Sequence, residues 1–259
     1  MNIAARYDAE MTETRDFLAR TDGERVAVRA ISGAGPTVVW LGGFKSEMVA
    51  TKAHALAGWA LSTGRSFIRF DYFGHGESSG QFRDGTISRW RGDALAMIDE
   101  QTTGDLVLVG SSMGGWIACL VALARPDRIK ALVLIAPAAD FTEKLMAPEI
   151  PPEGRAALVA DGVWLRPSQY GEPYPITQAL LDDGARWSIL DGAPIPLHMP
   201  VRILQGGQDP DVPWRHALAL AEALASDDVV FTLIKDGDHR LSRPQDIARL
   251  IAAVEEVSG

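Results

Sequence analysis

A serine flanked by two glycines is the first feature of this sequence that could do chemistry. Residues 110–114 read Gly-Ser-Ser-Met-Gly, so Ser112 takes the serine position of a G-x-S-x-G pattern. An apolar run precedes the pattern and an apolar helical stretch follows it, which predicts a strand, a sharp turn and a helix in series. Glycines two positions to either side permit such a turn, where a Cβ would clash. We therefore expect Ser112 to be a nucleophile, the alternative being a serine in a tight turn without chemistry.

The base for this serine should be a histidine, because a serine hydroxyl is a weak nucleophile at neutral pH. The strand, turn and helix around G-x-S-x-G resemble the nucleophile elbow of the α/β-hydrolases, in which the acid and then the histidine follow the serine in chain order. His198, His216 and His239 come after the serine. Only His239 directly follows a predicted strand, at a carboxyl end where open sheets place their sites. We expect His239 to be the base.

Two aspartates qualify as the acid that orients this histidine. They lie in residues 206–213, Gly-Gly-Gln-Asp-Pro-Asp-Val-Pro, just after a predicted strand. Asp209 begins a D-x-x-V-P pattern that resembles the acid loop of the same superfamily, while Asp211 qualifies by position alone. We expect Asp209 to accept the histidine Nδ1–H and to stabilise the imidazolium, with Asp211 as the alternative.

A glycine-rich loop, residues 40–46, follows an early predicted strand and is typical of an oxyanion hole. The expected donors are the main-chain N–H groups of Phe44 and Met113, the second at the positive end of a helix. Many α/β-hydrolases have His-Gly where this chain has Gly42-Gly43, and a plain β-turn is the alternative.

A second turn, residues 71–78, resembles the D-x-x-G-x-G-x-S turn of the α/β-hydrolases. That turn is mainly architectural in the superfamily. We therefore assign no chemistry to Asp71 or His75.

The elements that must position these residues form an α/β pattern. Apolar runs alternate with helical patterns, which predicts a mostly parallel sheet of about eight strands with helices on both faces. The expected strands are residues 25–30, 37–41, 66–72, 105–110, 130–136, 201–205 and 229–235, with 14–20 as a further edge strand. The expected helices are residues 87–100, 113–124, 214–225 and 244–257. The α/β-hydrolase fold is the predicted fold class.

Residues 140–200 break this alternation. They contain nine of the fifteen prolines and several aromatic residues, namely Phe141, Trp164, Tyr170, Tyr174 and Trp187. We expect a small cap inserted after the sixth strand, since long structureless connections are uncommon inside domains. The predicted core is then residues 1–139 and 201–259, with the cap at 140–200. The cap aromatics would line an acyl channel or form the cap's own small core.

Composition excludes several classes of protein. The 259 residues carry a formal net charge of −9, which argues against a nucleic-acid partner and against docking on an anionic membrane. A single cysteine, Cys119, permits no internal disulfide, and no zinc-type cluster of histidine and cysteine occurs. Residues 106–124 lack charge, but glycines interrupt them, so we expect no integral membrane segment. Residues 1–10 fit no targeting segment, and the cytoplasm is the expected location.

A narrower resemblance rests on a set of short stretches. The chain is similar to the small-cap family that contains the mitochondrial palmitoyl-protein thioesterase active on acyl glucuronides. The matching stretches are residues 70–72, 110–116, 125–126, 138–140 and 238–242. This resemblance implies a serine hydrolase for acyl esters or thioesters, with Ser112, Asp209 and His239 as its triad. A small molecule or an acylated protein would be the substrate, and no cofactor is needed.

Two other functions fit the same residues. A carbon–carbon bond hydrolase acting on a diketone keeps the serine triad and differs only in its pocket. A non-catalytic ligand-binding module on a hydrolase scaffold is the second alternative. Oligomeric state and acyl-chain length do not follow from the sequence.

Overall fold

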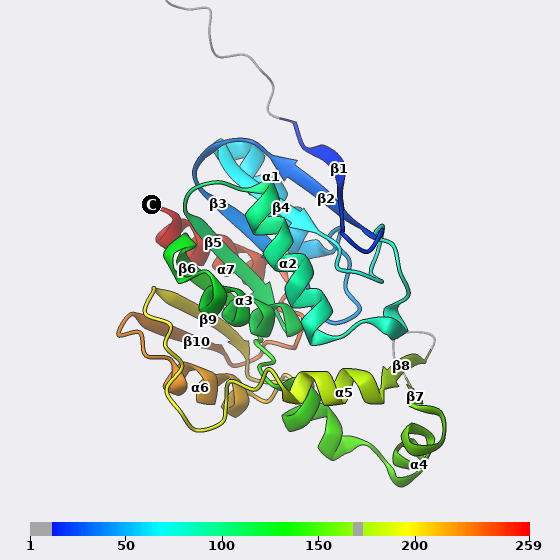
Figure 1. Ribbon diagram of the computed structural model, residues 1–259. Helices are drawn as coiled ribbons and strands as arrows, with labels where there is room; N and C mark the ends of the chain where they lie inside the picture. The colour runs from blue at the N-terminus through cyan, green and yellow to red at the C-terminus, as the bar shows by residue number, and fades with distance from the viewer. Residues whose placement is uncertain (1–11, 168–172) are drawn as a thin grey trace, which may run out of the picture.

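The computed structural model describes residues 12–167 and 173–259 (Figure 1). Its centre is an eight-stranded sheet in the order β1-β2-β4-β3-β5-β6-β9-β10. The strands are β1 (Thr14–Ala19), β2 (Arg25–Ile31), β3 (Ala34–Leu41), β4 (Arg65–Phe70), β5 (Leu106–Ser111), β6 (Ile129–Ile135), β9 (Val201–Gly206) and β10 (Val229–Ile234). The pairs β1–β2 and β2–β4 are antiparallel and the other pairs are parallel. The predicted α/β-hydrolase fold is confirmed. The targeting prediction for residues 1–10, and Tyr170, lie outside the described residues.

The central strands are covered on both faces, which explains their continuous apolar sequences. All six residues of β5 are buried, as expected for a parallel strand between two layers of helices. One apolar cluster joins the sheet to α2 (Ile87–Gln101), α3 (Met113–Ala124) and α6 (Trp214–Ala223). A second cluster joins the opposite face to α1 (Thr51–Thr63) and α7 (Pro244–Ser258). No helix among the described residues is long and apolar enough to cross a bilayer.

Helix α1 was not predicted from the sequence. Its buried stripe consists of three alanines together with Leu56 and Trp59, so the apolar periodicity is weak along the chain. Gly64 ends the helix with φ 71°, a left-handed conformation that glycine adopts without strain.

The segment between β6 and β9 contributes no strand to the large sheet. It contains α4 (Pro152–Asp161), α5 (Gln178–Ala185) and a separate antiparallel ribbon of β7 (Val163–Arg166) and β8 (Tyr174–Thr177). Single turns of π-helix and 3₁₀-helix, Thr142–Met146 and Ala147–Glu149, lead into it. Figure 1 shows this inserted segment beyond the carboxyl ends of the central strands.

A buried aspartate ties the two ends of the inserted segment together. Asp140, just after β6, is 1% exposed and has φ 54°. Its carboxylate accepts the Ser188 hydroxyl at 2.6 Å and the N–H groups of Ile189 and Leu190 at 2.9 Å each. The chain that leaves the sheet is therefore bonded to the chain that returns to it.

Candidate active site

Ser112 lies in a strained turn between β5 and α3. Its φ of 54° and ψ of −119° are sparsely populated for a residue with a Cβ. Strain of this kind costs about 1–3 kcal/mol and persists only where the surroundings impose it. Here the N–H of Ser112 donates to the Ile135 carbonyl at 2.8 Å, and the Ala138 N–H donates to the Ser112 carbonyl at 3.1 Å. The ends of β5 and β6 thus hold the turn.

The two flanking glycines are required by close backbone contacts. A Cβ on Gly110 would lie 2.3 Å from the Gly114 carbonyl oxygen. A Cβ on Gly114 would lie 2.0 Å from the Leu41 carbonyl oxygen. Both distances are far below van der Waals contact, so the turn closes against α3 and β3 only with glycine at these positions.

The structure brings Asp209 and His239 together. Nδ1 of His239 lies 2.8 Å from Oδ2 of Asp209, although 30 residues separate them. The Asp209 side chain is fully buried, while the imidazole remains 24% exposed. A carboxylate in this position holds one tautomer of the ring and leaves Nε2 free to accept a proton.

Asp209 is held in place by further donors. Its Oδ1 accepts the backbone N–H groups of Asp211 and Val212, both at 2.9 Å. Its Oδ2 also accepts Nε2 of Gln205 at 3.2 Å. Asp211 itself is exposed, so its backbone, and not its carboxylate, contributes to the orientation of the acid.

The loops that carry Asp209 and His239 are joined to each other. The N–H of Gln208 donates to the Gly237 carbonyl at 2.9 Å. A Cβ on Gly206 would lie 2.4 Å from the Asp238 carbonyl oxygen, so the end of β9 passes directly against the loop of His239. The parallel pairing of β9 with β10 brings these loops to the same edge of the sheet.

The predicted oxyanion loop lies against the nucleophile. A Cβ on Gly43 would lie 3.3 Å from the Ser111 carbonyl oxygen and 3.4 Å from Cβ of Ser112. Within the described residues, neither the Phe44 N–H nor the Met113 N–H has a hydrogen-bond acceptor. Two unpaired backbone donors next to a serine are the arrangement that an oxyanion requires.

The ring of Phe44 anchors this loop in an aromatic cluster. Its centroid lies 4.9 Å from that of Phe82, 5.8 Å from that of Trp90, 5.5 Å from that of Phe141 and 5.9 Å from that of Tyr174. Since Phe141 and Tyr174 belong to the inserted segment, that segment contacts the predicted oxyanion loop directly.

Ser112 is partly exposed, and its hydroxyl forms no hydrogen bond to any residue that the structure describes. His239 is therefore hydrogen-bonded to Asp209 and not to Ser112. Hydrogen bonds of this kind are often long before substrate binds.

The other histidines have different surroundings. Nε2 of His216 lies 2.7 Å from the Ala139 carbonyl oxygen, and burial lowers the pKa of this ring. His54 and His198 are exposed. His75 is buried beneath the oxyanion loop. Sequence patterns did not single out this last position as part of a site.

Asp209, Asp211 and His239 place potential ligand atoms within 4.8 Å of one another. Both carboxylate oxygens of Asp209 already accept N–H groups. The donor set therefore fits a hydrogen-bonded acid and base better than a metal centre.

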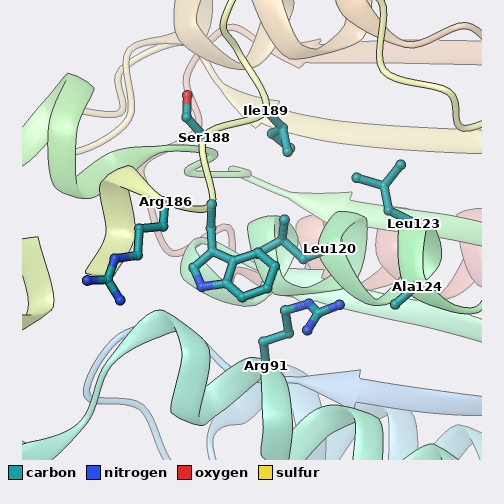
Figure 2. Close-up of a pocket in the computed structure, with 8 residues that line it drawn as sticks. Arg91, Leu120, Leu123, Ala124, Arg186, Ser188 and Ile189 are labelled. Atoms are coloured by element: carbon teal, nitrogen blue, oxygen red, sulfur yellow. The ribbon is translucent and has the colours of Figure 1, made fainter. Parts of the chain in front are cut away.

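Two cavities lie apart from these residues. One of about 270 Å³, drawn in Figure 2, is formed by apolar side chains of α3 together with Arg91 and residues 186–189. The Arg91 guanidinium carbon lies 4.3 Å from the centroid of the Trp187 ring, and Figure 2 shows the Arg186 side chain pointing away from Arg91. The other, of about 600 Å³, separates the first turns of α1 and α7.

Comparison with known proteins shows the family of this chain. The family model described as serine aminopeptidase, S33, matches residues 35–170. The chain is 36% identical over 243 residues to the mitochondrial palmitoyl-protein thioesterase ABHD10 of Bos taurus, covering 93% of this chain and 79% of that protein. The chain belongs to the S33 family of α/β-hydrolases. The corresponding human thioesterase is 35% identical over 93% of the chain.

Solved structures show the same relationship. A putative hydrolase from Agrobacterium vitis has a TM-score of 0.90 and 44% identity, covering 96% of this chain and 99% of that one. Mouse ABHD10 has a TM-score of 0.85 and 36% identity, covering 94% and 97%. This member of the S33 family is therefore an enzyme, a hydrolase with the α/β-hydrolase fold.

Proposed function

We propose that the protein hydrolyses acyl thioesters or esters through an acyl-enzyme on Ser112. The observation that carries this proposal is the 2.8 Å hydrogen bond between Asp209 and His239, on the same sheet edge as the strained serine turn. A buried carboxylate that orients an imidazole is the arrangement that activates a serine for acyl transfer.

The proposed reaction has two halves. Oγ of Ser112 bonds to the acyl carbon while Nε2 of His239 takes the hydroxyl proton, and the carbonyl electron pair moves onto oxygen. The N–H groups of Phe44 and Met113 stabilise this oxyanion. When the tetrahedral intermediate collapses, the thiolate or alkoxide leaves and receives the proton from His239.

Water completes the cycle. His239 takes a proton from a water molecule as its oxygen bonds to the acyl carbon, and the second intermediate expels Oγ of Ser112. The imidazolium returns its proton to that oxygen, which releases a carboxylic acid and restores the enzyme. Asp209 accepts Nδ1–H throughout and stabilises the imidazolium.

We further propose that the inserted segment is a cap that selects the acyl group. Support comes from the contact of Phe141 and Tyr174 with the Phe44 ring, which places apolar walls beside the oxyanion loop. The relatives are named palmitoyl-protein thioesterases, which supports a long acyl chain on a small thiol or on a protein. Cytoplasmic location stays a prediction from the sequence, and the name of these relatives includes "mitochondrial".

The test is a chain-length series of acyl thioesters and matched oxyesters with purified protein. We expect Ser112→Ala to lower kcat by about 10⁴–10⁶ and to abolish labelling by a fluorophosphonate probe. Ser111→Ala is the matched control, because Ser111 carries the neighbouring buried hydroxyl at the end of β5. This variant should keep the wild-type kcat and the labelling by the fluorophosphonate probe. Labelling that moves from Ser112 to Ser111, or full activity without Ser112, would refute the mechanism.

A further inference from the structure

The buried imidazole of His75 carries an inference that rests on the proposed function. This residue belongs to the 71–78 turn, which the sequence marks only as architectural. Its ring is 4% exposed and is surrounded by the rings of Tyr72, Phe82 and Trp90 at centroid distances of 5.1–5.9 Å. The ring is therefore held firmly, and its two nitrogens have defined directions.

Both nitrogens of His75 meet backbone groups. Nε2 accepts the Lys45 N–H at 3.1 Å, and Nδ1 lies 3.0 Å from the Phe73 carbonyl oxygen. An N–H can only donate and a carbonyl can only accept, so Nε2 is the bare nitrogen and Nδ1 carries the hydrogen. This neutral tautomer is the state that burial favours, since burial lowers the pKa of His75 to about 4.

The partner of Nε2 is next to the proposed oxyanion donor. Lys45 directly follows Phe44, and its φ of 55° is in the left-handed region, which is unfavourable for lysine. The Lys45 N–H is part of the Phe44–Lys45 peptide, so its hydrogen bond to His75 fixes the plane of that peptide. The Phe44 N–H belongs to the preceding peptide, which shares the Phe44 Cα with the Phe44–Lys45 peptide, so a displacement at Lys45 would also change the direction of the Phe44 N–H.

The same 71–78 turn also binds Met48, two residues beyond the 40–46 loop. Oδ1 of Asp71 accepts the Met48 N–H at 2.6 Å, and its Oδ2 accepts the Glu77 N–H at 2.9 Å. One turn therefore holds this segment at two places, at Lys45 through an imidazole and at Met48 through a carboxylate. The tie at Lys45 is the nearer one to the reacting atoms.

We propose that His75 is a positioning residue that holds the oxyanion loop through the Lys45 N–H. It touches neither substrate nor nucleophile and acts through the backbone between Lys45 and Phe44. Its absence should therefore weaken binding of the transition state while leaving ground-state binding largely intact.

His75→Phe and His75→Gln test this proposal as a pair. Phenylalanine fills the aromatic surroundings but offers no acceptor, whereas the glutamine side-chain oxygen can accept the Lys45 N–H. We expect His75→Phe to lower kcat about 10–100-fold, less than the 10²–10³ for complete loss of a donor. KM should change less than about 3-fold, and affinity for a trifluoromethyl ketone analogue should fall by the same factor as kcat. His75→Gln should recover most of the loss, and thermal unfolding reports the folded state of both variants.

Amide hydrogen exchange provides a readout that does not depend on turnover. The Lys45 amide should be protected in the wild-type protein and in His75→Gln, and should exchange at least about tenfold faster in folded His75→Phe. An unprotected Lys45 amide in the wild type, or equal kcat and analogue affinity in His75→Phe and wild type, would overturn the proposal. Absence of acyl hydrolysis by the wild type would instead refute the proposed function, while the exchange experiment would still decide the role of His75.

Discussion

At the scale of single residues, the choice between two aspartates depends on which carboxylate the fold buries. Asp209 and Asp211 share a loop, and both lie near His239. Only Asp209 is buried and bonded to the ring. The exposed carboxylate of Asp211 has no comparable role, because solvent screens its charge.

Asp209→Asn is therefore expected to lower kcat by about 10³–10⁴, since an amide that donates toward Nδ1 favours the wrong tautomer. Asp211→Asn removes an equal charge two residues away and should stay within about 3-fold of wild type, because its backbone N–H to Asp209 is kept. Steady-state kinetics on one acyl thioester compares the two variants. Equal losses would show that the acid has been misassigned.

Substitution of single glycines tests the close backbone contacts of the turn at Ser112. Gly114→Ala places a methyl group 2.0 Å from a backbone oxygen of β3, while Gly58→Ala on α1 meets nothing within 4 Å. Both glycines are in helices, so propensity alone favours alanine by up to about 1 kcal/mol at each. We expect Gly58→Ala to be neutral or stabilising, and Gly114→Ala to lower the free energy of unfolding by at least about 2 kcal/mol. Urea denaturation measures both, and a stable Gly114→Ala protein would contradict the close contact.

At the scale of elements, one carboxylate connects the inserted segment to the sheet. Asp140 accepts three donors from residues 188–190, so the helices α4 and α5 are enclosed between two bonded chain ends. The conformation at Asp140 suits asparagine as well, because both residues tolerate a positive φ. Substitution by asparagine therefore removes one hydrogen-bond acceptor without adding backbone strain.

Asp140→Asn should destabilise the protein by about 1–3 kcal/mol, because an amide nitrogen replaces an oxygen that faces donors. Limited proteolysis should cut within residues 141–199 faster than in the wild type. Asp191→Asn is the control, since Asp191 is exposed and, within residues 12–167 and 173–259, its carboxylate accepts only the N–H of Ala193. Unchanged proteolysis in Asp140→Asn would mean that packing alone holds the segment.

At the scale of the whole molecule, two buried groups make stability depend on pH in opposite directions. Burial lowers the pKa of His75 to about 4, so the folded state binds fewer protons and loses stability as the pH falls from 6.5 toward 4. Burial raises the pKa of Asp93 to about 6. The folded state then binds more protons, and stability falls as the pH rises from 3.8 toward 6.

From the size of each pKa shift, each group changes the free energy of unfolding by about 3 kcal/mol. The pH ranges over which the two groups act overlap. Relative to wild type, His75→Gln should become less stable by up to this amount as the pH rises from 4 to 6.5. Asp93→Asn should become relatively more stable over the same range. Urea unfolding at pH 4.5, 5.5 and 6.5 measures both slopes, and slopes of the same sign would contradict the assignment.

Local sequence was sufficient to predict most of the fold and the sharp turn at Ser112. The observed bounds of β5 and α3, Leu106–Ser111 and Met113–Ala124, agree with the predicted strand and helix because apolar runs and periodicity are local properties. The glycines around Ser112 indicate the turn for the same reason. Helix α1 was not predicted because three of its buried residues are alanines, which differ little in hydrophobicity from their neighbours in the sequence.

Tertiary structure alone decided which groups meet. The sequence could propose Asp209 over Asp211 only by resemblance, whereas burial and a hydrogen bond to His239 distinguish them in three dimensions. The contact of His75 with Lys45 and that of Asp140 with Ser188 join positions 30 and 48 residues apart. No local pattern encodes such contacts, because a side chain's partner depends on how the strands order themselves in the sheet and on what the resulting core leaves buried.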